Sequence, residues 1–390
     1  KMKIPYGRQE ILDEDIEAVI STLKAELITQ GPMVEEFEES IARYHNVKHA
    51  IAFSNGTTAL HAAYYALGVR EGDEIISPAM TFVASSNGGV YCGATPVLVD
   101  IDLETNCIDI NQIEAAITDK TKTICAVSLA GYPVDLKKVR EIADKHNLHV
   151  IHDGAHAIGA RREGSFNLDN ADFTMFSFHP VKHITTGEGG MLLTNSDMFA
   201  KNARLFRTHG ITKVKEEMNI YEGPWSYEMI DEGNNYRLND FQCALGYSQF
   251  KRIEKNLKRR NLIAKRYNEA FSQCADIIIP PHFDLSNFSE TTDVKTIANL
   301  NSYHLYTLRL KDNSQRLDFY NYLKENGIFA QIHYIPISWF KFYQDNYGYK
   351  KTDFKNANEY YESEVSLPMY HALTDEEQEY VIKVVLDYFK

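Results

Sequence analysis

The chain of 390 residues has only five cysteines, two tryptophans and no long apolar run. The cysteines are scattered without a CxxC spacing, which argues against a zinc ribbon or a redox-active pair. No stretch approaches the roughly 20 apolar residues that a membrane helix requires. Residues 1–6 also lack the apolar core of a signal peptide. We therefore expect a cytoplasmic protein with no membrane partner, whose thiols are reduced and mostly structural.

Positively charged residues are fewer than negatively charged ones. Lysine and arginine number 41 against 54 aspartates and glutamates, which gives a net charge of −13. Such a surface disfavours nucleic acid, because phosphate binding needs clustered Lys and Arg. The most basic stretch, 251–260, has helical apolar spacing and is typical of a solvated helix face. We expect no nucleic-acid partner, although a small anionic substrate remains compatible with this charge.

Several nucleotide and metal motifs are missing. The sequence has no GxxxxGK[ST], which argues against a nucleotide triphosphatase, and the glycines of 187–190 do not form GxGxxG. His152 and His156 flank Asp153 in a pattern that superficially suggests metal ligands. His152 belongs to a strand-like run, however, and no third ligand is evident. We therefore expect no metal site.

The chain does contain an alternation of short apolar strands and helices in its first half. Near-continuous apolar strands separated by helices predict a mostly parallel sheet covered on both faces. Functional residues are then expected at the carboxyl edge of the sheet. We predict strands at 74–78, 95–100, 123–128 and 149–153, and helices at 59–67, 111–117 and 135–147.

Beyond about residue 250 the pattern changes. A basic helix is followed by strand-like runs and by two further helices, the last of which begins with the capping-box pair Thr374 and Glu377. Because the chain is too long for one ordinary core, we predict an α/β protein with a large domain at 1–250 and a smaller α+β domain at 251–390. The predicted elements of the smaller domain are strands at 303–310 and 329–334 and helices at 316–326 and 374–388, with an apolar segment at 277–281 after the basic helix.

Three segments together suggest one chemistry. Lys182 lies between a short apolar stretch and a glycine-rich turn, and Asp153 ends a buried strand. Gly56 and Thr57 lie where a helix begins, so their N–H groups could bind a phosphate. Alone, the lysine could be a surface charge and the glycine segment an ordinary capped helix. Combined, they supply the amine, the carboxylate and the anion site that pyridoxal phosphate needs.

Each of these groups would have a defined role. Burial near a cationic ring would leave the Lys182 amine partly neutral, able to hold the cofactor aldehyde and to move a proton. Asp153 opposite the pyridine nitrogen would favour the protonated ring. We interpret His156 as a ring-stacking or oxygen-contacting residue rather than a metal ligand.

At this point the residues resemble a known family, the DegT-type nucleotide-sugar aminotransferases, a branch of the fold-type I pyridoxal phosphate enzymes. The likeness runs from about Ile4 to the C-terminus. It implies a large domain with a mostly parallel central sheet and a smaller C-terminal domain. The motifs that carry it lie at 27–32, 54–57, 77–82, 153–157, 177–182, 233–237 and 331–336.

The resemblance also implies residue roles. Lys182 would form the Schiff base with the cofactor, and Asp153 would pair with the pyridine nitrogen. Asn235 would reach the phosphate of the neighbouring subunit, which makes the expected assembly a homodimer with shared active sites. Arg237 would meet an anionic group of donor or acceptor, with a structural ion pair as an equal alternative. The other implied cofactor contacts are Gly56, Thr57 and Ser177 at the phosphate and Phe82 and His156 at the ring.

Within the family, segments 206–211, 303–306, 329–336 and 365–368 are most similar to the C4-aminotransferases of pseudaminic acid biosynthesis. That subgroup moves an amino group from L-glutamate to UDP-4-keto-6-deoxy-N-acetyl sugars. Tyr6 could equally be a packing aromatic of the N-terminal segment. The residues that the likeness assigns to the sugar-nucleotide pocket are Tyr6, Glu26, Leu27, Ile28, Thr29, Gln331, Ile332, His333 and Tyr334.

Three alternatives remain open from the sequence. The enzyme could act on another nucleotide-linked keto-deoxysugar, at C3 or C4. A sugar dehydratase using the same cofactor is disfavoured, because those relatives carry histidine at the position of Lys182, whereas His183 here is only its neighbour. A non-catalytic sensor that binds the cofactor would have little reason to keep a complete catalytic set.

Overall fold

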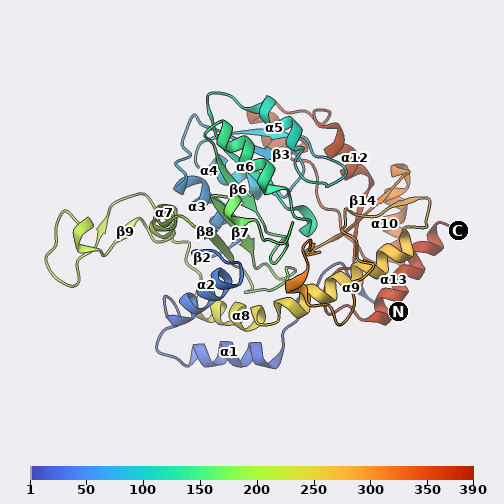
Figure 1. Ribbon diagram of the computed structural model, residues 1–390, viewed down its shortest axis with the longest axis horizontal. Coiled ribbons are helices and arrows are strands. Elements are labelled where there is room, and N and C mark those ends of the chain that lie inside the picture. The colour runs from blue at the N-terminus through green and yellow to red at the C-terminus, as the bar shows by residue number, and fades with distance from the viewer. Residues whose placement is uncertain (1) are drawn as a thin grey trace.

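A computed structural model describes residues 2–390. Its centre is a seven-stranded sheet with the strand order β2-β8-β7-β6-β5-β3-β4 (Figure 1). Strand β8 is antiparallel to both of its neighbours, and the other six strands run in one direction. The predicted α/β class is thus confirmed. The strands are β2 (His49–Phe53), β3 (Glu74–Pro78), β4 (Thr95–Val99), β5 (Thr121–Val127), β6 (His149–Asp153), β7 (Phe173–Ser177) and β8 (Gly190–Thr194).

Helices cover both faces of this sheet, and alternate residues of its strands contact different layers. In β6, Val150 packs into the cluster formed with α5 and α6, whereas Ile151 packs into the cluster formed with α3 and α7. This period of two follows from the pleat of a strand. The helices around the sheet are α1 (Asp13–Leu23), α2 (Pro32–Tyr44), α3 (Gly56–Ala66), α4 (Ala84–Tyr91), α5 (Ile110–Ala116), α6 (Leu136–Lys145), α7 (Asp197–Arg207) and α8 (Asp240–Phe250).

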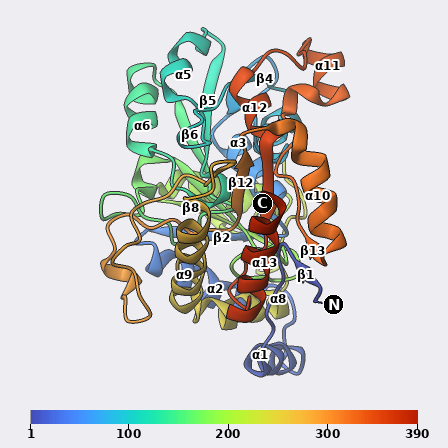
Figure 2. The ribbon, with the colours of Figure 1, turned by 90° about the vertical axis from the view of Figure 1, so that its right-hand side faces the viewer.

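The C-terminal part forms a second layer beside this sheet (Figure 2). Its antiparallel sheet has the order β11-β12-β14 and shares a hydrophobic cluster with α9, α10 and α13. The first strand, β1, pairs in parallel with β13, so the N-terminal segment packs on this layer. The elements are β1 (Ile4–Pro5), α9 (Ile253–Phe271), β11 (Ile277–Ile278), β12 (Tyr306–Leu310), α10 (Arg316–Glu325), β13 (Ile328–Phe329), α11 (Lys341–Tyr347), α12 (Lys355–Ser363), β14 (Glu364–Leu367) and α13 (Asp375–Tyr388).

A hairpin-like arm projects from the large sheet between α7 and α8 (Figure 1). Its short strands β9 (Ile211–Thr212) and β10 (Glu228–Met229) pair antiparallel. The residues between them include several large apolar side chains that are exposed to solvent, namely Ile220, Tyr221, Trp225 and Tyr227.

Most predicted elements are present, with one clear error. The strands predicted at 74–78 and 149–153 have these bounds, and Thr374 and Glu377 form the predicted capping box of α13. The strand predicted at 329–334 is wrong. Only Ile328–Phe329 pair, with β1, and Gln331 makes an isolated bridge to Ser366 before the chain continues without regular structure. Among residues 2–390, no helix is long and apolar enough to cross a membrane.

Candidate active site

A cavity of about 450 Å³ opens at the carboxyl edge of the large sheet. Strands β5 and β6 end at its wall with Val127 and Asp153, and β7 ends there with Ser177. The C-terminal layer closes the opposite side with His304 and Tyr334. The cavity therefore lies where an open α/β sheet is expected to bind a ligand.

Lys182 projects into this cavity from the loop between β7 and β8. Its Nζ lies 3.4 Å from Nε2 of His304. Burial lowers the pKa of Lys182 to about 8, while the carboxylate of Asp153 acts in the opposite direction. A substantial part of this amine is therefore neutral near physiological pH, as a nucleophilic lysine requires.

Asp153 is held by two hydrogen bonds at the end of β6. Oδ2 accepts a 2.6 Å bond from Oγ of Ser85, and Oδ1 accepts a 3.0 Å bond from the backbone N–H of Ala155. Burial raises the pKa of Asp153, whereas these two donors and the charge of Lys182 lower it. The carboxylate is thus fixed in orientation and needs a further cationic partner to stay ionised.

The first turn of α3 supplies unpaired backbone donors. Asn55 caps the helix, and its Oδ1 accepts a 2.8 Å bond from the N–H of Thr58. The N–H groups of Gly56 and Thr57 have no hydrogen-bond partner within the part of the chain that the structure describes, and both residues line the cavity. Within residues 2–390, Oγ of Ser177 accepts only a long 3.4 Å bond from the N–H of His179. Together they form a site suited to a phosphate.

His156 connects the two sides of the cavity. Its Nδ1 accepts a 3.0 Å bond from the backbone N–H of Ala130, so its Nε2 carries the proton and donates to Oη of Tyr334 at 3.1 Å. Burial lowers the pKa of His156 well below its usual value, which keeps the ring neutral. Phe82 lines the cavity with 55% of its surface exposed. It is available to pack against a bound ring.

These groups fit pyridoxal phosphate. The cavity wall combines a partly neutral amine, a buried carboxylate that lacks a full counter-charge, and free N–H donors at a helix N-terminus. A Cβ on Gly56 would lie 3.2 Å from Sδ of Met175, so a larger residue at this position would crowd the cavity wall. The structure brings together the predicted cofactor contacts Lys182, Asp153, Gly56, Thr57, Phe82, His156 and Ser177.

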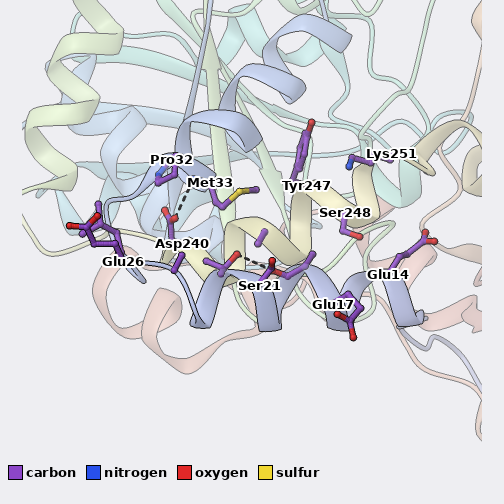
Figure 3. Close-up of a pocket in the computed structure, with 15 residues that line it drawn as sticks. Glu14, Glu17, Ser21, Glu26, Pro32, Met33, Asp240, Tyr247, Ser248 and Lys251 are labelled. Carbon is purple, nitrogen blue, oxygen red and sulfur yellow. Dashed lines mark hydrogen bonds between the residues drawn. The ribbon is translucent and has the colours of Figure 1, made fainter.

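The predicted sugar-nucleotide residues do not all line the same cavity of one chain. Tyr6, His333 and Tyr334 line the Lys182 cavity. Glu26 and Leu27 instead line a larger cavity of about 930 Å³ between α1 and α8, and Figure 3 shows Glu26 at one end of it and Glu14 at the other.

The remaining predicted contacts do not line the Lys182 cavity of their own chain. Arg237 borders a separate surface pocket with Arg204 and Arg207. Asn235 is exposed and pairs with Thr208 in an isolated bridge. Their roles stay predictions, as do those of Ile28, Thr29, Gln331 and Ile332.

Two residues of the site were not predicted from the sequence. Ser85, the hydrogen-bond donor to Asp153, follows the motif at 77–82 by less than one helical turn. His304 lies in the recognised segment 303–306, but nothing in that segment indicates a contact with Lys182. In both cases the only signal was proximity to a motif.

The model of the DegT/DnrJ/EryC1/StrS aminotransferase family matches residues 9–386. The chain is 34% identical over 383 residues to the UDP-4-amino-4,6-dideoxy-N-acetyl-beta-L-altrosamine transaminase of Campylobacter jejuni, covering 97% of this chain and 95% of that protein. Helicobacter pylori PseC, an aminotransferase involved in the biosynthesis of pseudoaminic acid, superposes with a TM-score of 0.89, at 30% identity over 99% of each chain. A Streptococcus pneumoniae protein described as a sugar aminotransferase, in its PLP form, superposes over 100% of each chain with a TM-score of 0.87 at 30% identity. The family match and these neighbours agree with the geometry around Lys182: the chain belongs to the DegT/DnrJ/EryC1/StrS aminotransferase family, with the fold of the fold-type I enzymes and pyridoxal phosphate as its cofactor.

Proposed function

We propose that this enzyme moves an amino group from L-glutamate to the C4 keto group of a UDP-4-keto-6-deoxy-N-acetylhexosamine, a reaction of the pseudaminic acid type. The observation that carries the proposal is the likeness to the Campylobacter jejuni transaminase over nearly the whole of both chains. The superposition on Helicobacter pylori PseC supports the same sugar class.

The residues of the cavity suit this transfer. Bound pyridoxal phosphate supplies an aldehyde that accepts the amino group and a ring that withdraws electrons. Lys182 carries an amine of lowered pKa that can bind that aldehyde and move a proton. Asp153, fixed by Ser85 and Ala155, stabilises a protonated ring nitrogen. The free N–H groups at the start of α3 orient the phosphate.

A homodimer with shared active sites is part of the proposal. Leu27, Ile28 and Phe82 are about half exposed, and Trp225 on the arm is 72% exposed. Apolar side chains so exposed on one protein favour a protein partner. Asn235 and Arg237 do not line their own chain's Lys182 cavity, so a role at the cofactor or substrate requires a second copy. We also propose a cytoplasmic location, which the five unpaired cysteines support.

The test is the product mass after the enzyme is incubated with pyridoxal phosphate, L-glutamate and the UDP-4-keto-6-deoxy-N-acetylhexosamine. A glutamate-dependent exchange of the keto oxygen for an amine supports the proposal. Loss of water instead would identify a dehydratase. No change with this sugar, but amination of a GDP- or dTDP-linked keto sugar, would overturn the substrate assignment and leave the aminotransferase chemistry intact.

A control separates chemistry from binding. Lys182→Ala should abolish amination, whereas Lys137→Ala, an exposed lysine on α6, should not. Conversion of the cofactor by glutamate, without amination of any keto sugar, would favour the non-catalytic sensor.

A further inference from the structure

A buried carboxylate lies behind the Lys182 cavity and is connected to it by two hydrogen bonds. Glu364, the first residue of β14, has no exposed surface. Its Oε2 accepts a 2.9 Å bond from the backbone N–H of His333. Its Oε1 shares a hydrogen bond with Oγ of Ser366, and that hydroxyl lies 2.8 Å from Nδ1 of His333. Glu364, Ser366 and the His333 ring thus form one continuous chain.

The far end of the chain reaches the cavity. His333 lines the cavity, and its ring centroid is 5.2 Å from that of Tyr6. Its Nε2 has no hydrogen-bond partner within residues 2–390. Burial lowers the pKa of His333 to about 3, so the ring is neutral at working pH. A neutral imidazole carries one proton, so one nitrogen donates and the other accepts.

The single hydrogen of the Ser366 hydroxyl links the state of Glu364 to that of the His333 ring. If Glu364 is ionised, the hydroxyl must donate to Glu364 and accept from Nδ1–H of His333, which leaves Nε2 without a proton. If Glu364 is protonated, its O–H donates to Ser366, the hydroxyl donates to Nδ1, and Nε2 carries the proton. Each protonation state of the carboxyl therefore corresponds to one tautomer of the ring.

We propose that Glu364 and Ser366 are positioning residues that set the tautomer of His333, and thereby decide whether its Nε2 donates or accepts a hydrogen bond in the Lys182 cavity. On the proposed function, the donor form matches the keto oxygen of the sugar or a carboxylate of glutamate. The acceptor form matches a sugar hydroxyl.

The surroundings of Glu364 determine which form prevails near neutral pH. Burial raises the pKa of Glu364 to about 8. The hydrogen bonds to Ser366 and to the His333 N–H, and then the charge of Arg316, oppose this shift only in part. Arg309 is the cross-strand neighbour of Glu364, but its guanidinium bonds Ser363 and Glu359 instead. The donor form of His333 should thus dominate at pH 7 and give way to the acceptor form above about pH 8. The titratable and charged groups around Glu364 are His333 and Tyr334 of the loop, Arg309 of β12, Arg316 of α10 and Tyr360 of α12.

The test observes the tautomer directly. Enzyme loaded with pyridoxal phosphate is labelled with ¹⁵N-histidine, and long-range ¹H–¹⁵N spectra at pH 6.5 and pH 9.5 locate the ring proton, with His333→Asn identifying the resonance. In the unmutated enzyme we expect Nε2–H at pH 6.5 and Nδ1–H at pH 9.5. In Glu364→Gln the amide oxygen accepts the backbone N–H of His333, so the NH2 group faces Ser366 and donates to it. This variant should keep Nε2–H at both pH values.

If the His333 ring carries its proton on the same nitrogen in the unmutated enzyme and in Glu364→Gln at pH 9.5, the proposal is overturned. Ser366→Ala should remove the switch, because the link is lost. Thr307→Val is the matched control. Thr307 is the buried cross-strand neighbour of Ser366, and within residues 2–390 its hydroxyl has no hydrogen bond to Glu364 or His333, so loss of that hydroxyl should leave the switch unchanged. The spectra need no sugar substrate, so a wrong sugar assignment and a wrong relay give different results.

Discussion

Oγ of Ser85 donates a 2.6 Å hydrogen bond to Oδ2 of Asp153, and both side chains are buried. Because this bond lowers the pKa of Asp153, Ser85→Ala should raise it further. At a given pH a smaller fraction of Asp153 would then be ionised to pair with the cofactor ring. We expect the dissociation constant of pyridoxal phosphate to increase roughly 10- to 100-fold near pH 7, the usual worth of a hydrogen bond to a charged group.

The measurement is a fluorescence or absorbance titration of apoenzyme at several pH values. The loss of affinity on acidification should begin at a higher pH in Ser85→Ala than in the unmutated enzyme, since the carboxyl is protonated earlier. Ser86→Ala is the matched control, because Ser86 is equally buried but bonds Tyr343 rather than Asp153. Equal effects of the two variants would show that packing, not the carboxylate, was disturbed.

The pKa of Lys182 gives a second prediction. A value of about 8, lowered by burial from 10.5, means that the amine is mostly protonated below pH 8 and mostly neutral above it. Only the neutral amine attacks an aldehyde. The association rate of pyridoxal phosphate with apoenzyme, followed by stopped-flow absorbance, should therefore rise between pH 6.5 and 8.5 and then level off. A rise that continues toward pH 10.5 would contradict the lowered pKa.

The parts of this enzyme that its sequence predicts are those defined by local patterns. The strand at 149–153 follows from its apolar run, and Asp153 and Lys182 follow from their motifs. Ser85 bonds a residue 68 positions away, and Lys182 meets His304 across 122 positions. Contacts at such separations leave no local pattern.

Other features that the sequence did not predict also depend on contacts between residues distant in the chain. Glu364 has no exposed surface, yet a glutamate next to Val365 and Ser366 reads as a surface residue of a strand. The strand predicted at 329–334 has suitable residues, but only Phe329 pairs with β1 and only Gln331 bridges Ser366. Pairing depends on the three-dimensional neighbours rather than on propensity. The domain boundary at residue 250 stays a prediction, and the pairing of β1 with β13 places the N-terminal residues beside the smaller unit.

Shared active sites lead to a complementation prediction. Lys182→Ala and Asn235→Ala should each be inactive as homodimers, because every site lacks one of the two residues. After the two proteins are mixed and their subunits exchanged, one site of each heterodimer has both residues, so activity should return to about a quarter of the unmutated value. Turnover measured before and after exchange tests this. Recovery that stays at zero, with heterodimers verified by mass spectrometry, would place Asn235 at the cofactor of its own chain. An Asn235→Ala homodimer that is active by itself would place this residue outside the site.

Gly190 gives the last prediction, because its position next to the phosphate site leaves no room for a side chain. A Cβ on Gly190 would lie 2.5 Å from the backbone oxygen of Asn55 and 2.8 Å from the nitrogen of Gly56. Gly190→Ala must therefore displace the first turn of α3, whose free N–H groups suit a phosphate. Affinity for pyridoxal phosphate should fall by about 10-fold or more, while affinity for pyridoxal, which has no phosphate, should change little.

The comparison with Gly187 separates this local effect from general strain. A Cβ on Gly187 meets nothing within 4 Å, but its φ of +79° is unfavourable for alanine, at a cost of about 1–2 kcal/mol. Gly187→Ala should thus lower the unfolding temperature and leave the ratio of the two affinities unchanged. If Gly190→Ala weakened pyridoxal and pyridoxal phosphate equally, the start of α3 would not be the phosphate site. If instead only the affinity for pyridoxal phosphate fell, the absence of a side chain at Gly190 would be linked to phosphate recognition, because only the phosphate contact with α3 distinguishes the two ligands.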